Sequence, residues 1–154
     1  MKQTTLCYIE KDDAYLMLHR VKKADDANFE KWIGIGGKIE DKESPYDCIR
    51  REAMEEVGLE LCDLHYRGII TFVSDVYPTE YMHLFHAGGF SGTLKDECDE
   101  GVVRWVKKED IEKLPLWEGD KIFLRLLSDN TPFFSLKLEY SGDTLISHTL
   151  DFAK

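Results

Sequence analysis

Three glutamates at helical spacing are the residues of this sequence best suited to chemistry. Glu52, Glu55 and Glu56 stand at positions i, i+3 and i+4, so on a helix their carboxylates converge within one turn. Carboxylate oxygens suit Mg²⁺, which keeps several of its waters and commonly bridges protein carboxylates to substrate phosphates. Because residues 52–56 contain no His or Cys, the pattern favours Mg²⁺ or Mn²⁺ over zinc. A solvated acidic face is the alternative that spacing alone leaves open.

Neighbouring residues could support such a site. Gly36 and Gly37 precede the acidic segment, and without a Cβ they let the backbone approach a metal ion or a phosphate closely. Arg51 lies beside the glutamates, and we expect it to orient Glu43 or Glu52 rather than to bind a substrate.

A helix over residues 45–57 would position these side chains. Ser44 has the character of an N-cap, Pro45 suits the first helical position, and Gly58 is placed to end the helix. At about 100° per residue, the segment carries one apolar stripe that we expect to pack inward. The stripe consists of Tyr46, Ile49, Ala53 and Val57.

The rest of the chain is rich in strand patterns. Strands are expected over residues 4–10, 15–20, 64–75, 80–87 and 101–106, with a C-terminal hairpin over 134–140 and 146–152. Shorter helices are expected over 108–113 and 118–127. Because the helices are few and dispersed, the sequence predicts an α/β (α+β) fold, a curved mixed β-sheet with a helix on either side.

Composition limits the kind of protein. The 154 residues, 43% of them hydrophobic, predict one domain over 1–154. Since Lys plus Arg number 20 against 30 Asp plus Glu, the net charge of −10 argues against a nucleic-acid polymer as partner. No apolar run approaches the roughly 20 residues that span a bilayer, so we expect a soluble, cytoplasmic protein without a membrane partner. The four cysteines form no C-x-x-C pair, and we expect reduced, mostly structural thiols.

The segment 37–59 resembles the Nudix box, G-x5-E-x7-R-E-U-x-E-E-x-G-U. The matching residues are Gly37, Glu43, Arg51, Glu52, Ala53, Glu55, Glu56, Gly58 and Leu59. This resemblance implies an α/β/α sandwich and Mg²⁺-dependent hydrolysis of a nucleoside diphosphate linked to another group. It also implies that Glu52, Glu55 and Glu56 are catalytic metal ligands, joined by the Gly36 carbonyl. In some members the Glu52 position instead acts as, or positions, the base for the attacking water, and the sequence leaves both roles open.

Further segments are similar to the MutT-type 8-oxo-dGTP diphosphatases within this family. Residues 32–38 match their W-x-G-x-G-G-K entry, and Glu100 falls in an acidic loop, 96–100, where that group places another metal-ligating glutamate. The resemblance implies that Trp117 stacks on the base and that Asp120 hydrogen-bonds to it, although Trp117 could instead be a core anchor. Lys23, Gly37 and Lys38 are expected near the phosphates, although Lys23 could equally be a solvated surface lysine.

One departure affects the expected substrate. Some relatives have an Asn that reads the purine edge where this chain has Ile33, which can offer a base only apolar contact. The expected reaction is hydrolysis of 8-oxo-dGTP to its monophosphate and pyrophosphate. The alternatives are another nucleotide, such as an ordinary dNTP, ADP-ribose, a dinucleoside polyphosphate or an RNA 5′ triphosphate, or a non-catalytic nucleotide sensor. The sequence leaves open whether the protein is a monomer or a homodimer.

Overall fold

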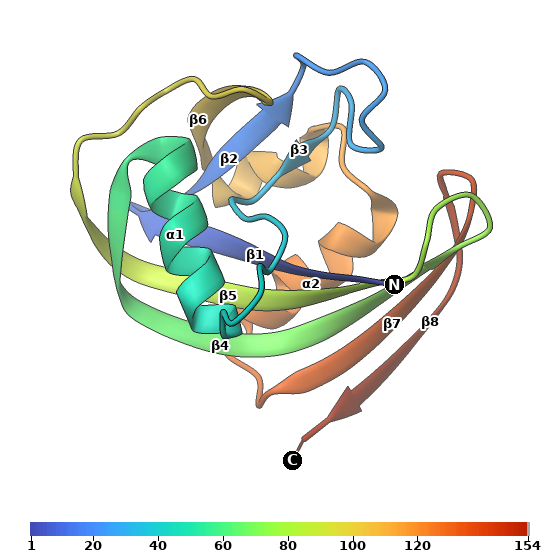
Figure 1. Ribbon diagram of the computed structural model, residues 1–154. Helices are drawn as coiled ribbons and strands as arrows, with labels where there is room; N and C mark the ends of the chain where they lie inside the picture. The colour runs from blue at the N-terminus through green and yellow to red at the C-terminus, as the bar shows by residue number, and fades with distance from the viewer. Residues whose placement is uncertain (154) are drawn as a thin grey trace.

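The computed structural model describes residues 1–153 and contains one eight-stranded sheet with helices on both faces (Figure 1). The strands are β1 (Lys2–Lys11), β2 (Ala14–Arg20), β3 (Trp32–Ile33), β4 (Leu59–Ser74), β5 (Glu80–Gly92), β6 (Gly101–Lys107), β7 (Phe134–Ser141) and β8 (Thr144–Phe152). The helices are α1 (Pro45–Val57), the 3₁₀ helix η1 (Lys108–Lys113) and α2 (Glu118–Ser128). The strand order is β3-β2-β1-β5-β4-β7-β8, and β6 pairs with the other edge of β2.

The sheet is mixed and splits near its middle. β1 runs parallel to β5, and β4 runs parallel to β7, whereas the other pairs are antiparallel. β1 and β2 form the expected hairpin but pair only at Glu10↔Tyr15 and Lys11↔Ala14, after which β2 continues beside β6. The edge of β1 that β2 leaves free pairs instead with the segment before α1, through a bridge between Cys7 and Ile35.

Each face of the sheet has its own hydrophobic core. Ile49, Ala53 and Val57 of α1 are fully buried against one face, as the apolar stripe predicts. Phe123, Leu124 and Leu127 of α2 pack against the other face. The expected α/β/α sandwich is therefore confirmed.

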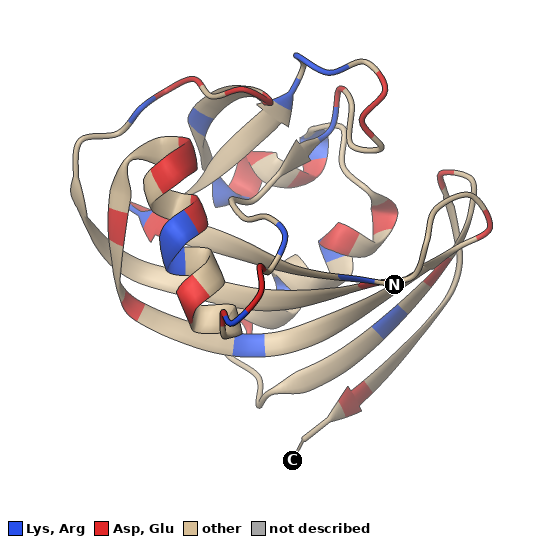
Figure 2. Ribbon diagram, viewed as in Figure 1, with Lys and Arg blue, Asp and Glu red and all other residues tan. Residues whose placement is uncertain are grey.

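Helix α1 begins and ends as the sequence predicts. The Ser44 hydroxyl accepts a hydrogen bond from the Asp47 N–H at 3.0 Å, and the Asp47 carboxylate accepts one from the Ser44 N–H at 3.0 Å. These reciprocal bonds form a capping box, which satisfies two backbone donors at the helix start. Gly58 ends the helix with φ of 73°, a left-handed conformation that costs glycine little. Figure 2 shows the acidic residues that α1 carries within this frame.

Several boundaries differ from the sequence predictions. β4 begins at Leu59, directly after the helix cap, so its pairing with β5 extends to Leu59↔Gly92. The short helix expected over residues 108–113 is present as a 3₁₀ helix, Lys108–Lys113.

All four cysteines are free, as expected. In the part of the chain that the structure describes, we found no helix with the length and apolarity needed to cross a membrane.

Candidate active site

Gly36 and Gly37 lie where the backbone passes between β1 and α1. The Thr5 N–H donates to the Gly37 carbonyl at 2.8 Å, which fixes this segment against β1. A Cβ on Gly36 would overlap the Thr5 carbonyl, and a Cβ on Gly37 would overlap the Glu52 carboxylate. Gly36 therefore requires glycine, because the overlap is with backbone, and the missing Cβ of Gly37 lets the Glu52 carboxylate pack directly onto the backbone.

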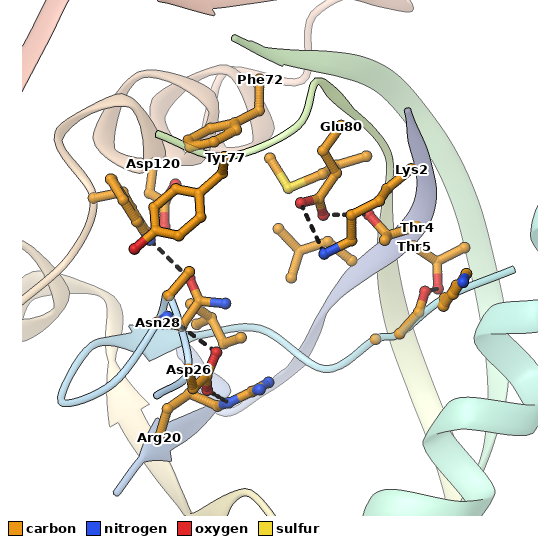
Figure 3. A pocket seen from close by; sticks show the side chains of 18 of the residues that line it. Lys2, Thr4, Thr5, Arg20, Asp26, Asn28, Phe72, Tyr77, Glu80 and Asp120 are labelled. Carbon is orange, nitrogen blue, oxygen red and sulfur yellow. Dashed lines mark hydrogen bonds and ion pairs between the residues drawn. The ribbon is translucent and has the colours of Figure 1, made fainter. Parts of the chain in front are cut away.

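A cavity of about 390 Å³ opens beside these glycines (Figure 3). Its wall includes Gly36, Gly37, Lys38, Ile33, Trp117 and Asp120. The structure thus brings four of the five predicted substrate-binding residues to one cavity. The fifth, Lys23, is exposed and does not line the cavity, so the assignment of Lys23 to phosphate binding stays a prediction without support from this geometry.

Trp117 is both a wall of the cavity and an anchor of the core. The residue is only 6% exposed, and its ring packs edge-on against Phe72 and Tyr140, with centroids 5.4 and 5.0 Å away. Its indole N–H donates to Asn28 Oδ1 at 2.7 Å, and Lys31 Nζ lies 4.6 Å from the ring centroid. Most of the Trp117 ring is therefore already covered, which fits the core-anchor alternative as well as a role beside the base.

Asp120 follows in the first turn of α2 and is 5% exposed. Burial raises the pKa of this carboxyl to about 8, and Lys31 opposes the rise. The group therefore holds its proton at pH 7, so it can both donate and accept a hydrogen bond. Such a carboxyl at the cavity wall can recognise a polar edge without adding a negative charge.

On the other side of the two glycines, Arg51 organises the carboxylates of α1. Its Nε and Nη2 donate to the two oxygens of Glu43, at 2.6 and 2.9 Å. Its Nη1 donates to Glu52 at 2.7 Å and to Glu55 at 3.2 Å, while Nη2 also reaches the Lys38 carbonyl at 3.1 Å. The bonds from Arg51 are the main reason that the pKa of Glu43 falls to about 2. Arg51 thus contacts both carboxylates that we expected it to orient.

The three glutamates of the acidic turn have different surroundings. The Glu52 side chain is 16% exposed and that of Glu55 is 59% exposed, so Glu55 lies largely in solvent. Burial raises the pKa of Glu52, against the lowering effect of Arg51. Glu56 is the most buried of the three, and the Gly36 N–H donates to one of its oxygens at 3.2 Å.

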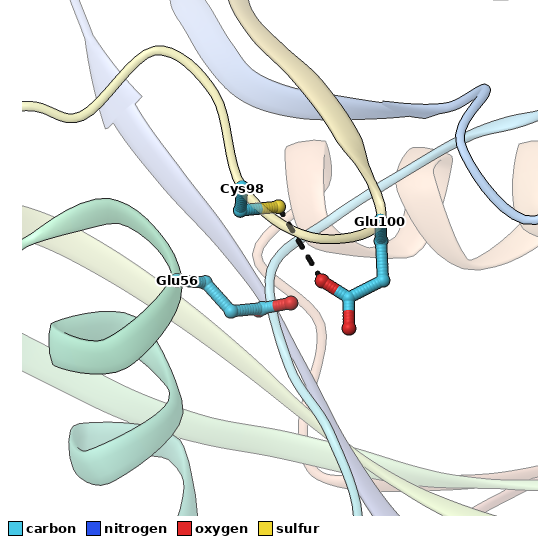
Figure 4. Close-up of side chains that lie close together, drawn as sticks. All are labelled: Glu56, Cys98 and Glu100. Carbon is cyan, nitrogen blue, oxygen red and sulfur yellow. Dashed lines mark hydrogen bonds between the residues drawn. The ribbon is translucent and has the colours of Figure 1, made fainter.

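Glu56 faces residues from the connection between β5 and β6 (Figure 4). Donor atoms of Glu56, Cys98 and Glu100 all lie within 4.8 Å of one another. Burial is the main reason that the pKa of Glu56 rises to about 8, and the nearby charges of Glu100 and Glu52 contribute to the rise. These groups fit a divalent cation, because a cation would offset the cost of holding their charges close together.

The predicted metal ligands occupy different positions around the acidic turn. The structure brings Glu56 and Glu100 together, places Glu52 against Gly37, and leaves Glu55 exposed on the same helical turn. Sequence reasoning missed Cys98, because nothing in its sequence context distinguishes it from a structural thiol. It also missed Asn28 and Phe72 at the cavity, which belong to a loop and to an apolar run without a motif.

Comparisons with known proteins identify the family of this chain. The NUDIX domain matches residues 2–127. The chain is 33% identical to the oxidized purine nucleoside triphosphate hydrolase of Danio rerio, over 79% of this chain and 78% of that protein. It is 28% identical to the uncharacterized Nudix hydrolase YvcI of Bacillus subtilis (strain 168), over 98% of this chain and 95% of that protein.

A solved structure extends the likeness to the whole chain. The crystal structure of a mutator MutT protein from Bacillus halodurans superimposes with a TM-score of 0.87 and 25% identity, covering 98% of each chain. The match therefore includes β7 and β8, which lie beyond the NUDIX domain match. With the domain match, the relatives and the fold in agreement, the chain belongs to the Nudix hydrolase family.

Proposed function

We propose that this protein is a Mg²⁺-dependent pyrophosphohydrolase that converts a nucleoside triphosphate, preferably an oxidised purine such as 8-oxo-dGTP, to its monophosphate and pyrophosphate. The observation that carries the proposal is the single cavity that joins Gly36 and Gly37 to Trp117 and Asp120. A nucleotide lying along it would have its phosphates beside the acidic turn of α1 and its base beside α2.

At the phosphate end, the proposal assigns the cation to Glu52, Glu55, Glu56 and Glu100, with the Gly36 carbonyl. Nudix hydrolases generally use a divalent metal, and when bound, Mg²⁺ or Mn²⁺ would neutralise phosphate charge and lower the pKa of a bound water. Arg51 keeps Glu52 in place, and the Gly36 N–H does the same for Glu56. Lys38, exposed at the rim of the cavity, supplies a positive charge near the phosphates.

At the base end, the proposal assigns recognition to Asp120. Its protonated carboxyl can donate to one atom of a purine edge and accept from another. Phe72 and Trp117 form apolar walls beside it, and Ile33 adds an apolar contact. The 33% identity to a protein named for oxidized purine nucleoside triphosphates favours that substrate class.

Ile33 supports a second candidate, an ordinary dNTP. Because its side chain has no hydrogen-bonding group, it cannot read a purine edge as an amide would. With fewer polar contacts to the base, discrimination between oxidised and ordinary purines would weaken.

A substrate panel tests the proposal. We expect kcat/KM for 8-oxo-dGTP to exceed that for dGTP by about tenfold or more, with pyrophosphate and monophosphate as products and with loss of turnover on chelation. The panel includes dNTPs, CTP, ADP-ribose and a dinucleoside polyphosphate. A higher kcat/KM for dGTP would favour the second candidate, and metal-dependent nucleotide binding without hydrolysis would indicate a sensor.

A further inference from the structure

Cys98 is the unexpected member of the acidic cluster. Its thiol lies beside the Glu100 carboxylate, with Sγ donating to Oε2 at 3.4 Å, and within 4.8 Å of a Glu56 donor atom (Figure 4). The other exposed or half-buried thiol of the chain, Cys62, lies on β4 outside this cluster.

The backbone holds Cys98 and Glu100 in place. The Cys98 N–H donates to the Gly101 carbonyl at 2.9 Å, which closes a tight turn. The Glu100 carbonyl accepts from the N–H groups of Val21 and Lys22, at 3.2 and 3.1 Å, which ties the turn to the end of β2. The two side chains are therefore preorganised by backbone bonds rather than carried on a loose loop.

Glu56 supplies the second indication of a ligand. The residue is 8% exposed, yet the Gly36 N–H is the only hydrogen-bond donor to its carboxylate among residues 1–153. The carboxyl group points toward Cys98 and Glu100 (Figure 4), and neither of them donates a hydrogen bond to it. A divalent cation bound between these groups would displace the proton of Glu56 and use the acceptor capacity that hydrogen bonds leave free.

The cluster offers a sulfur donor as well as two carboxylates, whereas a site for a hard ion such as Mg²⁺ has only oxygen donors. Mg²⁺ takes oxygen ligands, so it would use the two carboxylates and leave the thiol aside. Zn²⁺ and Co²⁺ accept thiolate together with carboxylate oxygen, and softer ligands shift a site toward such metals. When the sulfur–metal bond forms, the thiol gives its proton to solvent.

We infer that Cys98 is a third donor of this site, through which Zn²⁺, Co²⁺ and similar thiophilic divalent ions bind more tightly than an all-oxygen site would allow and compete with Mg²⁺. Cys98 is thus a determinant of metal selectivity. The inference rests on the metal site in the proposed function, but not on the identity of the nucleotide.

Titration of the full-length reduced protein with Co²⁺ tests this directly, because a thiolate bound to Co²⁺ gives a near-ultraviolet charge-transfer absorption. We expect this absorption in the wild type and in the matched control Cys62→Ser, and its loss in Cys98→Ser. We also expect the ratio of Zn²⁺ to Mg²⁺ affinity, measured by calorimetric competition, to fall by about tenfold or more in Cys98→Ser.

A second variant separates loss of the ligand from loss of the fold. Cys98→Asp replaces sulfur by oxygen, so we expect Co²⁺ still to bind by calorimetry but without the charge-transfer absorption. Absorption that persists in Cys98→Ser, or that is lacking in the wild type, would overturn the inference. If the absorption behaves as expected but no nucleotide is hydrolysed with Mg²⁺, the inference stands and the proposed function fails.

Discussion

Glu56 and Asp120 belong to opposite ends of the proposed nucleotide site, the acidic end and the base end, and the pKa of each rises to about 8, mainly through burial. Their surroundings nevertheless differ in kind. Two other acids, Glu100 and Glu52, contribute to the raised pKa of Glu56, against the lowering effects of the Gly36 N–H and Arg20. Among residues 1–153, no other acid contributes to the raised pKa of Asp120, which burial raises and Lys31 lowers.

This difference indicates what each end is built to receive. A positive ion at Glu56 would relieve the repulsion among the neighbouring acids, which supports the proposal of a metal at the acidic end. A positive ion at Asp120 would relieve no such repulsion, and a protonated carboxyl supports the proposal of a neutral, hydrogen-bonding group at the base end. Two carboxyl groups with similar pKa values are thus suited to different ligands, Glu56 to a cation and Asp120 to a hydrogen-bonding group.

The largest effect that this comparison predicts is on Glu56. In Glu56→Gln the side chain can still accept from the Gly36 N–H, but it loses the charge that would bind a cation. We expect kcat/KM with Mg²⁺ to fall on the order of 10³-fold. Steady-state kinetics measures this, with circular dichroism to check the fold.

The matched control is Glu60→Gln, which removes the same charge from an exposed position on β4. We expect its kcat/KM to stay within about threefold of the wild type, because exposed charges at a distance are largely screened. Equal losses in the two variants would mean that net charge, rather than the acidic end, governs turnover.

A smaller loss of kcat/KM is expected when the carboxylates of the acidic end keep their charges but are no longer held in place by Arg51. Lysine cannot reproduce the paired bonds from Arg51 to Glu43 together with the bond to Glu52, because it lacks the guanidinium fork. We expect Arg51→Lys to lower kcat/KM by about 10- to 100-fold, the range typical of residues that orient metal ligands. Arg50→Lys, at the adjacent exposed position, is the control and should remain near wild type. Turnover near the wild-type value in Arg51→Lys would show that Glu52 needs no such support.

How far the sequence predicts the molecule also differs between the two ends. Most of the acidic end is local: Arg51 and the three glutamates fall within residues 51–56 of α1, where helical spacing fixes their relative positions, and the two glycines lie shortly before the helix. Helix α1, its caps and its buried stripe could therefore be predicted, and the structure confirms them. Cys98 could not, because it reaches Glu56 only through the packing of a distant turn.

The base end is assembled from distant segments. Asn28, Phe72 and Trp117 come from a loop, a strand and the start of a helix, and no spacing rule relates them. The resemblance indicated Trp117 and Asp120, but the close packing of the Trp117 ring depends on β7 and on Lys31. The order of strands and the early separation of β1 from β2 likewise depend on tertiary pairing rather than local pattern.

Asp120→Asn tests the base end through pH. In the wild type, we expect kcat/KM for a purine triphosphate to fall as pH rises above about 8, because the carboxyl loses the proton that it donates. The amide of Asp120→Asn has no such proton to lose, so its profile should be flat in that range, at a value within about tenfold of the wild-type maximum. A decline of the same size in both variants would assign the pH dependence to another group.

Asp120→Asn should also raise the free energy of unfolding, by an amount that depends on pH. Below the unfolded pKa of about 4, the Asp120 carboxyl holds its proton in both states. Between about 4 and about 8 only the folded chain keeps it, so this group makes wild-type stability fall as pH rises through that window. We therefore expect Asp120→Asn to exceed the wild type in unfolding free energy by a few kcal/mol at pH 8, and to show little advantage at pH 4. Asp129→Asn, at the exposed end of the same helix, is the control, measured by denaturant unfolding at both pH values.

The smallest effect is expected at Ser44, which stabilises the helix that carries the acidic end without touching the site. Removing its hydroxyl leaves the Asp47 N–H without its capping partner. We expect Ser44→Ala to cost about 1 kcal/mol and to lower Tm by roughly 2–4 °C in calorimetry. Because Arg51 ties Glu43 and Glu52 together independently of the cap, kcat/KM should change less than about threefold.

Ser91→Ala, on an exposed strand position, is the control for the lost hydroxyl, with no comparable change in Tm. A large loss of activity in Ser44→Ala at unchanged Tm would mean that the cap, and not Arg51, sets the geometry of the acidic end.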